Sequence, residues 1–167
     1  MFVRIKKIKG NSYAYLVENS WNDKKARQKV KQYLGRVHEV EKVKDVPFEE
    51  FSKLTQEYKS IVSALMEWSL FQYGFTKDPL IQKKWIYDNG KIVGDPETFK
   101  ITSGKNNVTL KINEGYMNEY TLKEILNIDI TKQEQHVAGT KLAKVFVNAG
   151  ISIPHDVFIE LFQRVYI

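Results

Sequence analysis

The chain contains no cysteine and has only three histidines and four prolines among its 167 residues. The absence of cysteine excludes disulfide bonds, thiol catalysis and cysteine-ligated zinc. No apolar run approaches the ~20 residues that a membrane span needs. The first residues alternate basic and apolar side chains, without the continuous apolar segment of a signal peptide. We therefore expect a cytoplasmic protein that has no membrane partner.

Motifs for catalysis and for cofactor binding are also absent. The histidines, His38, His136 and His155, do not have the spacing of metal ligands. The sequence contains neither a glycine-rich phosphate-binding loop nor a nucleophile elbow. These absences predict a protein that is not an enzyme and that holds neither a metal nor another cofactor.

A metal-dependent nuclease is the enzymatic alternative, and it would need carboxylates that converge on Mg²⁺ with a lysine nearby. The nearest candidates are Asp88, Asp95, Glu97 and Lys100. Asp88 lies in a predicted hairpin turn and Asp95 precedes a proline, so turn formation accounts for both residues without a catalytic role.

Positive charge is concentrated at the start of the chain. Residues 1–45 contain 12 Lys and Arg against 5 Asp and Glu, whereas residues 46–167 contain 14 against 15. The formal net charge of +6 therefore arises entirely from the first quarter of the sequence. Such asymmetry indicates an anionic partner such as nucleic acid, with a merely solubilising surface as the alternative.

The basic segment has the pattern of three antiparallel strands separated by polar turns at residues 10–12 and 22–25. The predicted strands are Phe2–Lys9, Tyr13–Asn19 and Ala26–Val37, with a bend at Gly35. Because side chains alternate across a strand, each strand contributes to two faces. The predicted apolar face carries Val3, Ile5, Ala14, Leu16, Val30 and Leu34.

The other face combines basic residues with tyrosines and is the predicted nucleic-acid-binding surface. It carries Arg4, Lys6, Tyr13, Tyr15, Arg27, Lys29, Lys31 and Tyr33, with Arg36 at the end of the third strand. Lysine and arginine neutralise phosphates, and tyrosine donates to phosphate or stacks on bases. The alternative is a solvated face whose lysines protect the sheet edges from aggregation.

Helical spacing follows over Pro47–Gln72, with Asp45 as the expected N-cap, and this long helix is predicted to cover the sheet. A break at Thr76–Pro79 divides the chain into a basic sheet-plus-helix module (residues 1–75) and an α+β region (residues 76–167). The two regions could equally form one compact unit. The predicted fold class is α+β.

The second region begins with two predicted hairpins. One has its turn at Asn89-Gly90. The other pairs Thr98–Thr102 with Val108–Ile112 around residues 103–107.

Helices are predicted for the rest of the chain. A capping box begins at Thr121, a longer helix covers residues 132–149 with Gly150 as its C-cap, and a last helix begins at Pro154.

The order helix, Gly150, helix is that of a helix-turn-helix motif. The position four residues before the glycine is normally small, but here it is Phe146, and the turn over residues 150–154 is longer than usual. The pattern therefore favours an ordinary helical hairpin. Phe146, Phe158 and Phe162 recur along these helices, and they define a second interpretation of the protein as an interaction module or a homodimer.

Residues 1–40 carry a family resemblance. The matching segments are Phe2-Val3-Arg4 with Lys6 and Lys7, Tyr13–Asn19, Arg27–Val30 and Tyr33–Val37. In this order they resemble the N-terminal segment of DDE-type insertion-sequence transposases. The resemblance implies binding to transposon ends. The residues after 45 are too few for that family's catalytic domain and show no run of parallel strands, so the resemblance implies DNA binding without transposition.

We therefore predict a non-enzymatic protein that binds nucleic acid, with duplex DNA favoured, through the basic and tyrosine-rich face. The first alternative is a protein-interaction or dimerisation module. The second is a protein that binds single-stranded DNA or RNA on the tyrosines.

Overall fold

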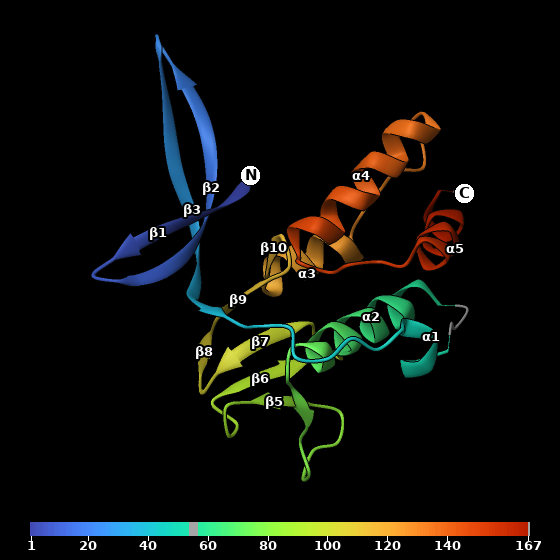
Figure 1. Cartoon of the computed structure of the whole chain (residues 1–167). Coiled ribbons are helices and arrows are strands. Elements are labelled where there is room, and N and C mark those ends of the chain that lie inside the picture. The colour runs from blue at the N-terminus through green and yellow to red at the C-terminus, as the bar shows by residue number, and fades with distance from the viewer. Residues whose placement is uncertain (54–56, 167) are drawn as a thin grey trace.

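Three antiparallel strands form the N-terminal region, as the alternation of side chains predicted. They are β1 (Phe2–Ile8), β2 (Asn11–Asn22) and β3 (Lys25–Glu39). The computed structural model describes residues 1–53 and 57–166, and in it β2 and β3 continue past the end of β1 as a projecting two-stranded hairpin (Figure 1). We call residues 18–29, the two-stranded part of this hairpin, the arm.

Both connections between these strands are two-residue turns. Lys9 and Gly10 have φ angles of 49° and 83°, and Asp23 and Lys24 have φ angles of 36° and 111°. Positive φ at both central residues matches the right-handed twist of the flanking strands. The predicted polar turns are therefore confirmed. Strand β1 ends one residue earlier than predicted, whereas β2 and β3 are longer than predicted because their pairing continues up to the turn residues.

Strand β3 is shared between the arm and the body of the protein. It pairs in parallel with β9 (Thr109–Ile112), and β9 pairs antiparallel with β10 (Gly115–Met117). The first sheet consequently has the order β1-β2-β3-β9-β10.

The second sheet is an antiparallel meander of short strands. They are β4 (Thr76–Lys77), β5 (Trp85–Tyr87), β6 (Ile92–Asp95), β7 (Lys100–Ser103) and β8 (Asn106–Asn107). The hairpin predicted at Asn89-Gly90 joins β5 to β6. The second predicted hairpin is present with a tighter turn, since β7 pairs with β8 and the Val108 N–H donates to the Ile101 carbonyl at 3.1 Å. The predicted pairing is wrong only beyond Val108, because β9 joins the other sheet.

Five helices lie in the described part of the chain. They are α1 (Phe48–Phe51), α2 (Tyr58–Gln72), α3 (Glu119–Leu126), α4 (Gln135–Asn148) and α5 (His155–Val165). None of these helices is long and apolar enough to cross a membrane.

The single long helix predicted over Pro47–Gln72 is two helices. The first ends at Phe51, and Ser52 after it has an extended backbone. Residues 54–56 of the predicted helix lie outside the described residues. Asp45 is not an N-cap: Pro47 precedes α1, and the Asp45 carboxylate accepts a hydrogen bond from Lys42 at 3.1 Å.

A capping box starts α3, three residues earlier than predicted. Asn118 is the N-cap, and its side chain accepts from the Thr121 N–H at 3.0 Å, while the Thr121 hydroxyl accepts from the Asn118 N–H at 3.1 Å. Later in the chain, Gly150 follows α4 with a φ of 71°, and Pro154 precedes α5, as predicted.

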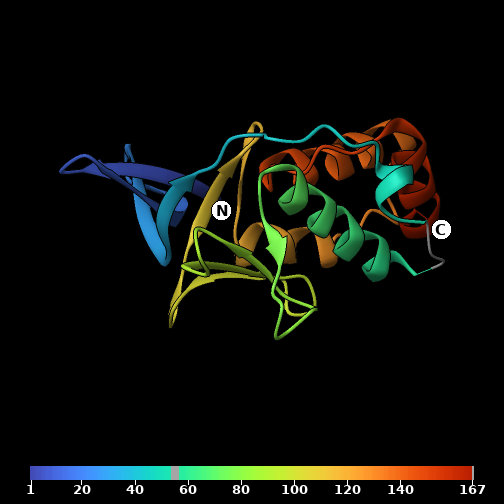
Figure 2. The same ribbon diagram turned by 60° about the horizontal axis from the view of Figure 1, so that its bottom comes forward.

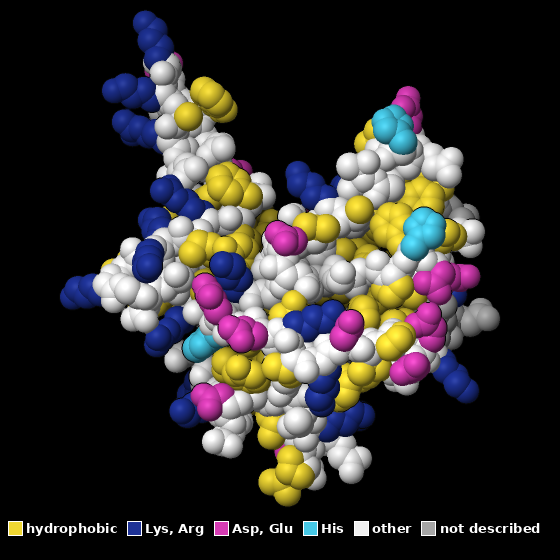
Figure 3. Space-filling view, in the orientation of Figure 1, with side chains coloured by type: hydrophobic (Ala, Val, Ile, Leu, Met, Phe, Trp, Pro, Cys, Tyr) yellow, Lys and Arg dark blue, Asp and Glu magenta, His cyan; other side chains and the backbone are white. Residues whose placement is uncertain are grey.

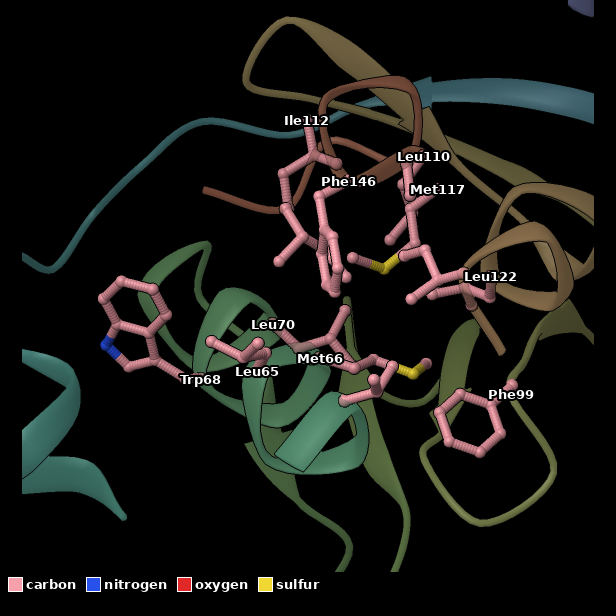
Figure 4. Packing of buried hydrophobic residues seen from close by; sticks show 14 of the residues in the cluster. Leu65, Met66, Trp68, Leu70, Phe99, Leu110, Ile112, Met117, Leu122 and Phe146 are labelled. Atoms are coloured by element: carbon pink, nitrogen blue, oxygen red, sulfur yellow. The ribbon is translucent and has the colours of Figure 1, made fainter. Parts of the chain in front are cut away.

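The main core surrounds α2. Leu65, Met66 and Leu70 of this helix lie toward Met117 and Phe146, which come from β10 and α4 (Figure 4). Helix α5 also packs against α2. One hydrophobic cluster extends from Val40 to Leu161 and contains residues on both sides of the predicted boundary at residue 75. The division into two domains stays a prediction.

The apolar face of the N-terminal sheet is not covered by α2, contrary to prediction. Ala14, Leu16 and Leu34 form a separate buried cluster, against which Tyr120 of α3 packs. The parallel pairing of β3 with β9 explains this contact, because α3 follows β10 and so begins close to the sheet. Figure 2 shows the resulting arrangement, with the N-terminal strands at one end of the molecule and most helices at the other.

We expect Gly35→Ala to destabilise the protein by at least about 2 kcal/mol. Gly35 has a φ of 101°, and a Cβ there would lie 2.1 Å from the Asn107 carbonyl oxygen. Gly10→Ala is the matched control, because its φ of 83° is also positive but a Cβ would meet nothing within 4 Å. Urea unfolding of both variants measures the difference, and equal losses would contradict a steric role for Gly35.

Candidate nucleic-acid interface

Three tyrosines lie together on one face of the N-terminal sheet. The ring centroids of Tyr15 and Tyr33 are 5.3 Å apart, and those of Tyr13 and Tyr33 are 6.4 Å apart. The Lys6 Nζ lies 5.2 Å from the Tyr15 ring centroid. Burial, together with the neighbouring Tyr15 and Tyr13, raises the pKa of Tyr33 above its ordinary value of 10.

A first β-bulge brings Arg36 onto this tyrosine face. Ala14 pairs with Gly35 and Tyr15 pairs with Tyr33, so Leu34 is the extra residue in β3. Paired residues in antiparallel strands project on the same side. Arg36 pairs with Tyr13, and its Nη2 donates to Asn11 Oδ1 at 2.8 Å. Strict alternation from Tyr33 would have placed Arg36 on the opposite face.

A second bulge reverses the alternation again, at Lys31. Leu16 pairs with Gln32 and Val17 pairs with Val30, so the residues nearer the arm's end change sides. Lys29 and Arg27 pair with Glu18 and Ser20, which alternate with the tyrosines along β2.

The predicted single basic face is therefore wrong for the second half of β3. Arg27 and Lys29 lie on the face opposite Tyr13 and Tyr15, and Lys31 is bonded to Glu18 on that same side, with an Nζ to Oε2 distance of 2.9 Å. Val30, predicted to be apolar and inward, lies on the tyrosine side and is 47% exposed. The bulges are the physical reason, since each adds one residue to β3 and shifts its alternation by one.

The remaining predicted residues, Arg4 and Lys6, belong to β1 and lie on the same face of the sheet as the tyrosines. Arg4 pairs with Tyr15 and donates a hydrogen bond to the Gln28 side chain across the sheet. Lys6 pairs with Tyr13. The structure thus brings six predicted residues together on the tyrosine face: Arg4, Lys6, Tyr13, Tyr15, Tyr33 and Arg36.

A polar groove continues the tyrosine face toward the second sheet. It has a volume of about 520 Å³ and lies between β3 and the hairpin of β7 and β8. Its lining includes no acidic residue and consists of Tyr33, Gly35, Arg36, His38, Ser103, Lys105, Asn106, Asn107 and Val108. The cations and amides in this lining are groups that donate hydrogen bonds to phosphate.

Three residues of this groove were not among the predicted site residues: Lys105, Asn106 and Asn107. They are about 70 positions from Arg36 in the chain, and only the parallel pairing of β3 with β9 brings them together. The sequence contains no local signal for that pairing.

Charge is unevenly distributed over the surface. Residues 1–39 carry ten Lys and Arg against three Asp and Glu. Figure 3 shows Lys and Arg gathered over the arm and the N-terminal sheet, whereas Asp and Glu gather toward the helical end. Of the three acidic residues, Glu18 bonds to Lys31, which lowers the Glu18 pKa, and Glu39 lies 3.6 Å from the Lys111 Nζ.

The carboxylates considered for a nuclease lie in turns or directly before one. The Asp95 side chain accepts from the backbone N–H groups of Glu97 at 3.0 Å and Thr98 at 3.4 Å. Asp88 has a φ of 52° in the β5–β6 turn and lies 3.6 Å from the Lys91 Nζ. Within residues 1–53 and 57–166, no three His, Cys, Asp or Glu side chains are grouped so that they could hold a metal ion.

The predicted aromatic surface of the C-terminal helices is only partly a surface. Phe146 is 1% exposed and belongs to the core, so its assignment to a partner surface is wrong. Phe158 and Phe162 are half-buried, with ring centroids 6.5 Å apart, and Phe162 stacks on Tyr166 at 4.8 Å.

Comparison of the chain with protein-family models, with curated protein sequences and with solved structures finds no match.

We expect His38 to titrate below its ordinary pKa of 6.5, because desolvation and the nearby Arg36 charge both disfavour the imidazolium. The unfolded chain then binds the proton more readily, so the stability that neutral His38 contributes is present above pH 6.5 and is lost as the pH falls below it.

Proton NMR of the His38 ring measures this midpoint. Arg36→Gln should raise it, although burial should still hold it below 6.5, and Lys83→Gln on an exposed distant loop is the control. A midpoint at or above 6.5, or one unmoved by Arg36→Gln, would contradict this account of the groove.

Proposed function

We propose that this protein binds nucleic acid, with duplex DNA as the favoured ligand, and that it does so without catalysing a reaction. The observation that carries the proposal is the composition of the N-terminal sheet. Residues 1–39 contain ten Lys and Arg but only three Asp and Glu, and three tyrosines cluster on one face of the sheet. Nucleic acid is the ligand that offers both a dense array of negative charge and flat aromatic surfaces.

Binding would combine two kinds of contact. Arg4, Lys6 and Arg36, together with Lys105 in the groove, would neutralise phosphates beside the tyrosines. The tyrosine hydroxyls would donate to phosphate, or their rings would contact bases. A two-stranded ribbon fits the major groove of B-DNA, which is about 12 Å wide, so the arm is suited to enter it.

The resemblance of residues 1–40 to the N-terminal segment of DDE-type transposases supports the same proposal, because it implies binding to DNA ends. The bulges preserve that support only for part of the matched segment. The Tyr13–Asn19 and Tyr33–Val37 matches supply the tyrosine face, whereas residues 27–29 of the Arg27–Val30 match lie on the arm.

The second candidate function is association with a protein or with a second copy of this chain. The observation that favours it is the half-buried aromatic stack of α5, beside which Ile159 is 43% exposed. This surface lies on α5, away from the basic strands, so a dimer formed there would leave the proposed nucleic-acid surface free and double the number of phosphate contacts.

We expect the full chain to bind labelled duplex DNA with an affinity that falls steeply with salt. Each neutralised phosphate contributes about 0.9 to the slope of log K against log salt concentration for duplex DNA, and about 0.7 for a single strand. Fluorescence anisotropy with matched duplex and single-stranded probes measures both the slope and the preferred form. Absence of binding at low salt would refute the proposal, and a preference for the single strand would favour the alternative on the tyrosines.

Three cations of β3 lie on the face opposite the tyrosines, and we expect their loss to weaken binding to all DNA sequences equally. The variant Arg27→Ala, Lys29→Ala, Lys31→Ala should reduce the salt slope by up to about 2.7 with duplex DNA. The control variant Lys83→Ala, Lys91→Ala, Lys132→Ala removes the same charge from exposed positions elsewhere and should leave the slope nearly unchanged. Equal effects of the two variants would mean that only net charge matters.

A further inference from the structure

The end of the arm carries a tryptophan that the fold leaves uncovered. Trp21 is 83% exposed and lies next to the turn between β2 and β3. Its partner across the hairpin is Ala26, whose methyl group is too small to cover an indole ring. The other tryptophans, Trp68 and Trp85, are 8% and 3% exposed, so Trp21 is the one that the protein presents to solvent.

An exposed tryptophan on an unpaired strand edge is not explained by solubility. Lysines on such edges prevent aggregation, whereas a large apolar ring there promotes it. The arm also lacks core packing, since residues 19–29 are all exposed, and a bare two-stranded ribbon is only marginally stable in water. Both features indicate that a partner covers the arm.

The chemistry around Trp21 selects the partner. Lys24 is in the turn itself, with a φ of 111° at a position that glycine normally occupies. Lys25, Arg27 and Lys29 follow along β3. The acidic residues of the arm are Asp23 and Glu18, so the arm has a net positive charge. An aromatic ring on one side of the arm, with cations in the turn and on the other side, matches a base and its phosphates, because the ring stacks on the base while the cations neutralise the backbone.

The second bulge gives the arm two different sides. Trp21 shares its side with Asn19 and Gln28, whereas Lys25, Arg27 and Lys29 project from the opposite side. Four residue steps of extended strand separate the base of the arm at Glu18 from its end at Asn22, a length of about 13 Å. This length exceeds the roughly 8.5 Å depth of the major groove, so the end of the arm can reach base edges while its cations remain near the phosphates.

We propose that Trp21 stacks on an unpaired or unstacked base of a bound duplex, so that the protein prefers DNA with such a defect over perfectly paired DNA. This proposal rests on the proposed function and adds the structural class of the nucleic acid. The arm supplies the stacking contact at its end, and the tyrosine face and groove hold the flanking backbone.

Tryptophan fluorescence tests the contact directly. Trp68 donates to the Val46 carbonyl at 2.7 Å and Trp85 donates to Glu67 Oε2 at 3.1 Å, and both are buried, so a change on binding reports Trp21. A duplex with one bulged nucleotide should quench the emission and protect it from acrylamide. The fully paired duplex of the same sequence should do so weakly, and Trp21→Phe subtracts the signal of the buried pair.

Binding of the same two duplexes by variants separates stacking from electrostatics. We expect Trp21→Leu, which keeps an apolar side chain but removes the ring, to lose roughly ten-fold affinity for the bulged duplex and little for the paired one. Trp21→Phe should retain most of the preference. Neither variant should alter the salt slope, because neither removes a charge. Circular dichroism verifies that the exposed position tolerates both changes.

The outcomes distinguish the failure of each proposal. If no duplex binds at low salt, the proposed function fails and this inference fails with it. If both duplexes bind with a steep salt slope, but Trp21 is not quenched and Trp21→Leu keeps the same preference as the parent chain, the stacking role alone is refuted. Equal quenching by both duplexes would also refute it, because it would show contact with DNA that does not depend on an exposed base.

Discussion

The arrangement of this protein depends on strand β3, which pairs antiparallel with β2 on one edge and parallel with β9 on the other. At Gly35 this strand passes so close to the Asn107 carbonyl that no side chain can fit between them. That contact, and the Thr109 hydroxyl that donates to the Leu34 carbonyl at 2.9 Å, attach the basic sheet to the body. The groove with His38 and Lys105 exists because of this attachment, since its two walls come from the two partners of the contact.

The same strand also determines on which face of the sheet its functional side chains lie. Its bulge at Leu34 adds Arg36 to the tyrosine face, and its bulge at Lys31 turns Arg27 and Lys29 to the other side. A sheet with regular alternation from Tyr33 would have placed Lys25, Arg27, Lys29 and Lys31 beside the tyrosines and Arg36 on the opposite face. The bulged sheet instead has an aromatic side that ends in Trp21 and a basic side behind it. In the proposed complex, the first side suits bases and the second suits a phosphate backbone.

The body has a simpler organisation. Helix α2 lies within the main core, so it stabilises the molecule without touching the small cluster of Ala14, Leu16 and Leu34. Tyr120 of α3 covers that cluster instead. The N-terminal sheet therefore needs little of the body to bury its apolar face, which leaves the tyrosine face and the arm uncovered.

The three strands, their two turns and the β5–β6 hairpin were predictable, because each depends on local preferences for strand and turn residues. The grouping of the tyrosines with Arg4 and Lys6 was also predictable, since alternation holds along β1 and β2. The sides of Val30, Arg27 and Lys29 were not, because bulges shift the alternation of β3, and neither was Lys105, because the pairing of β3 with β9 joins distant segments. The sequence by itself thus determined the local strands and the excess of positive charge at the N-terminus. The tertiary structure alone decided which side each cation occupies and what lies across the groove, because the bulges shift the alternation of β3 and the parallel pairing joins β3 to a distant segment of the chain.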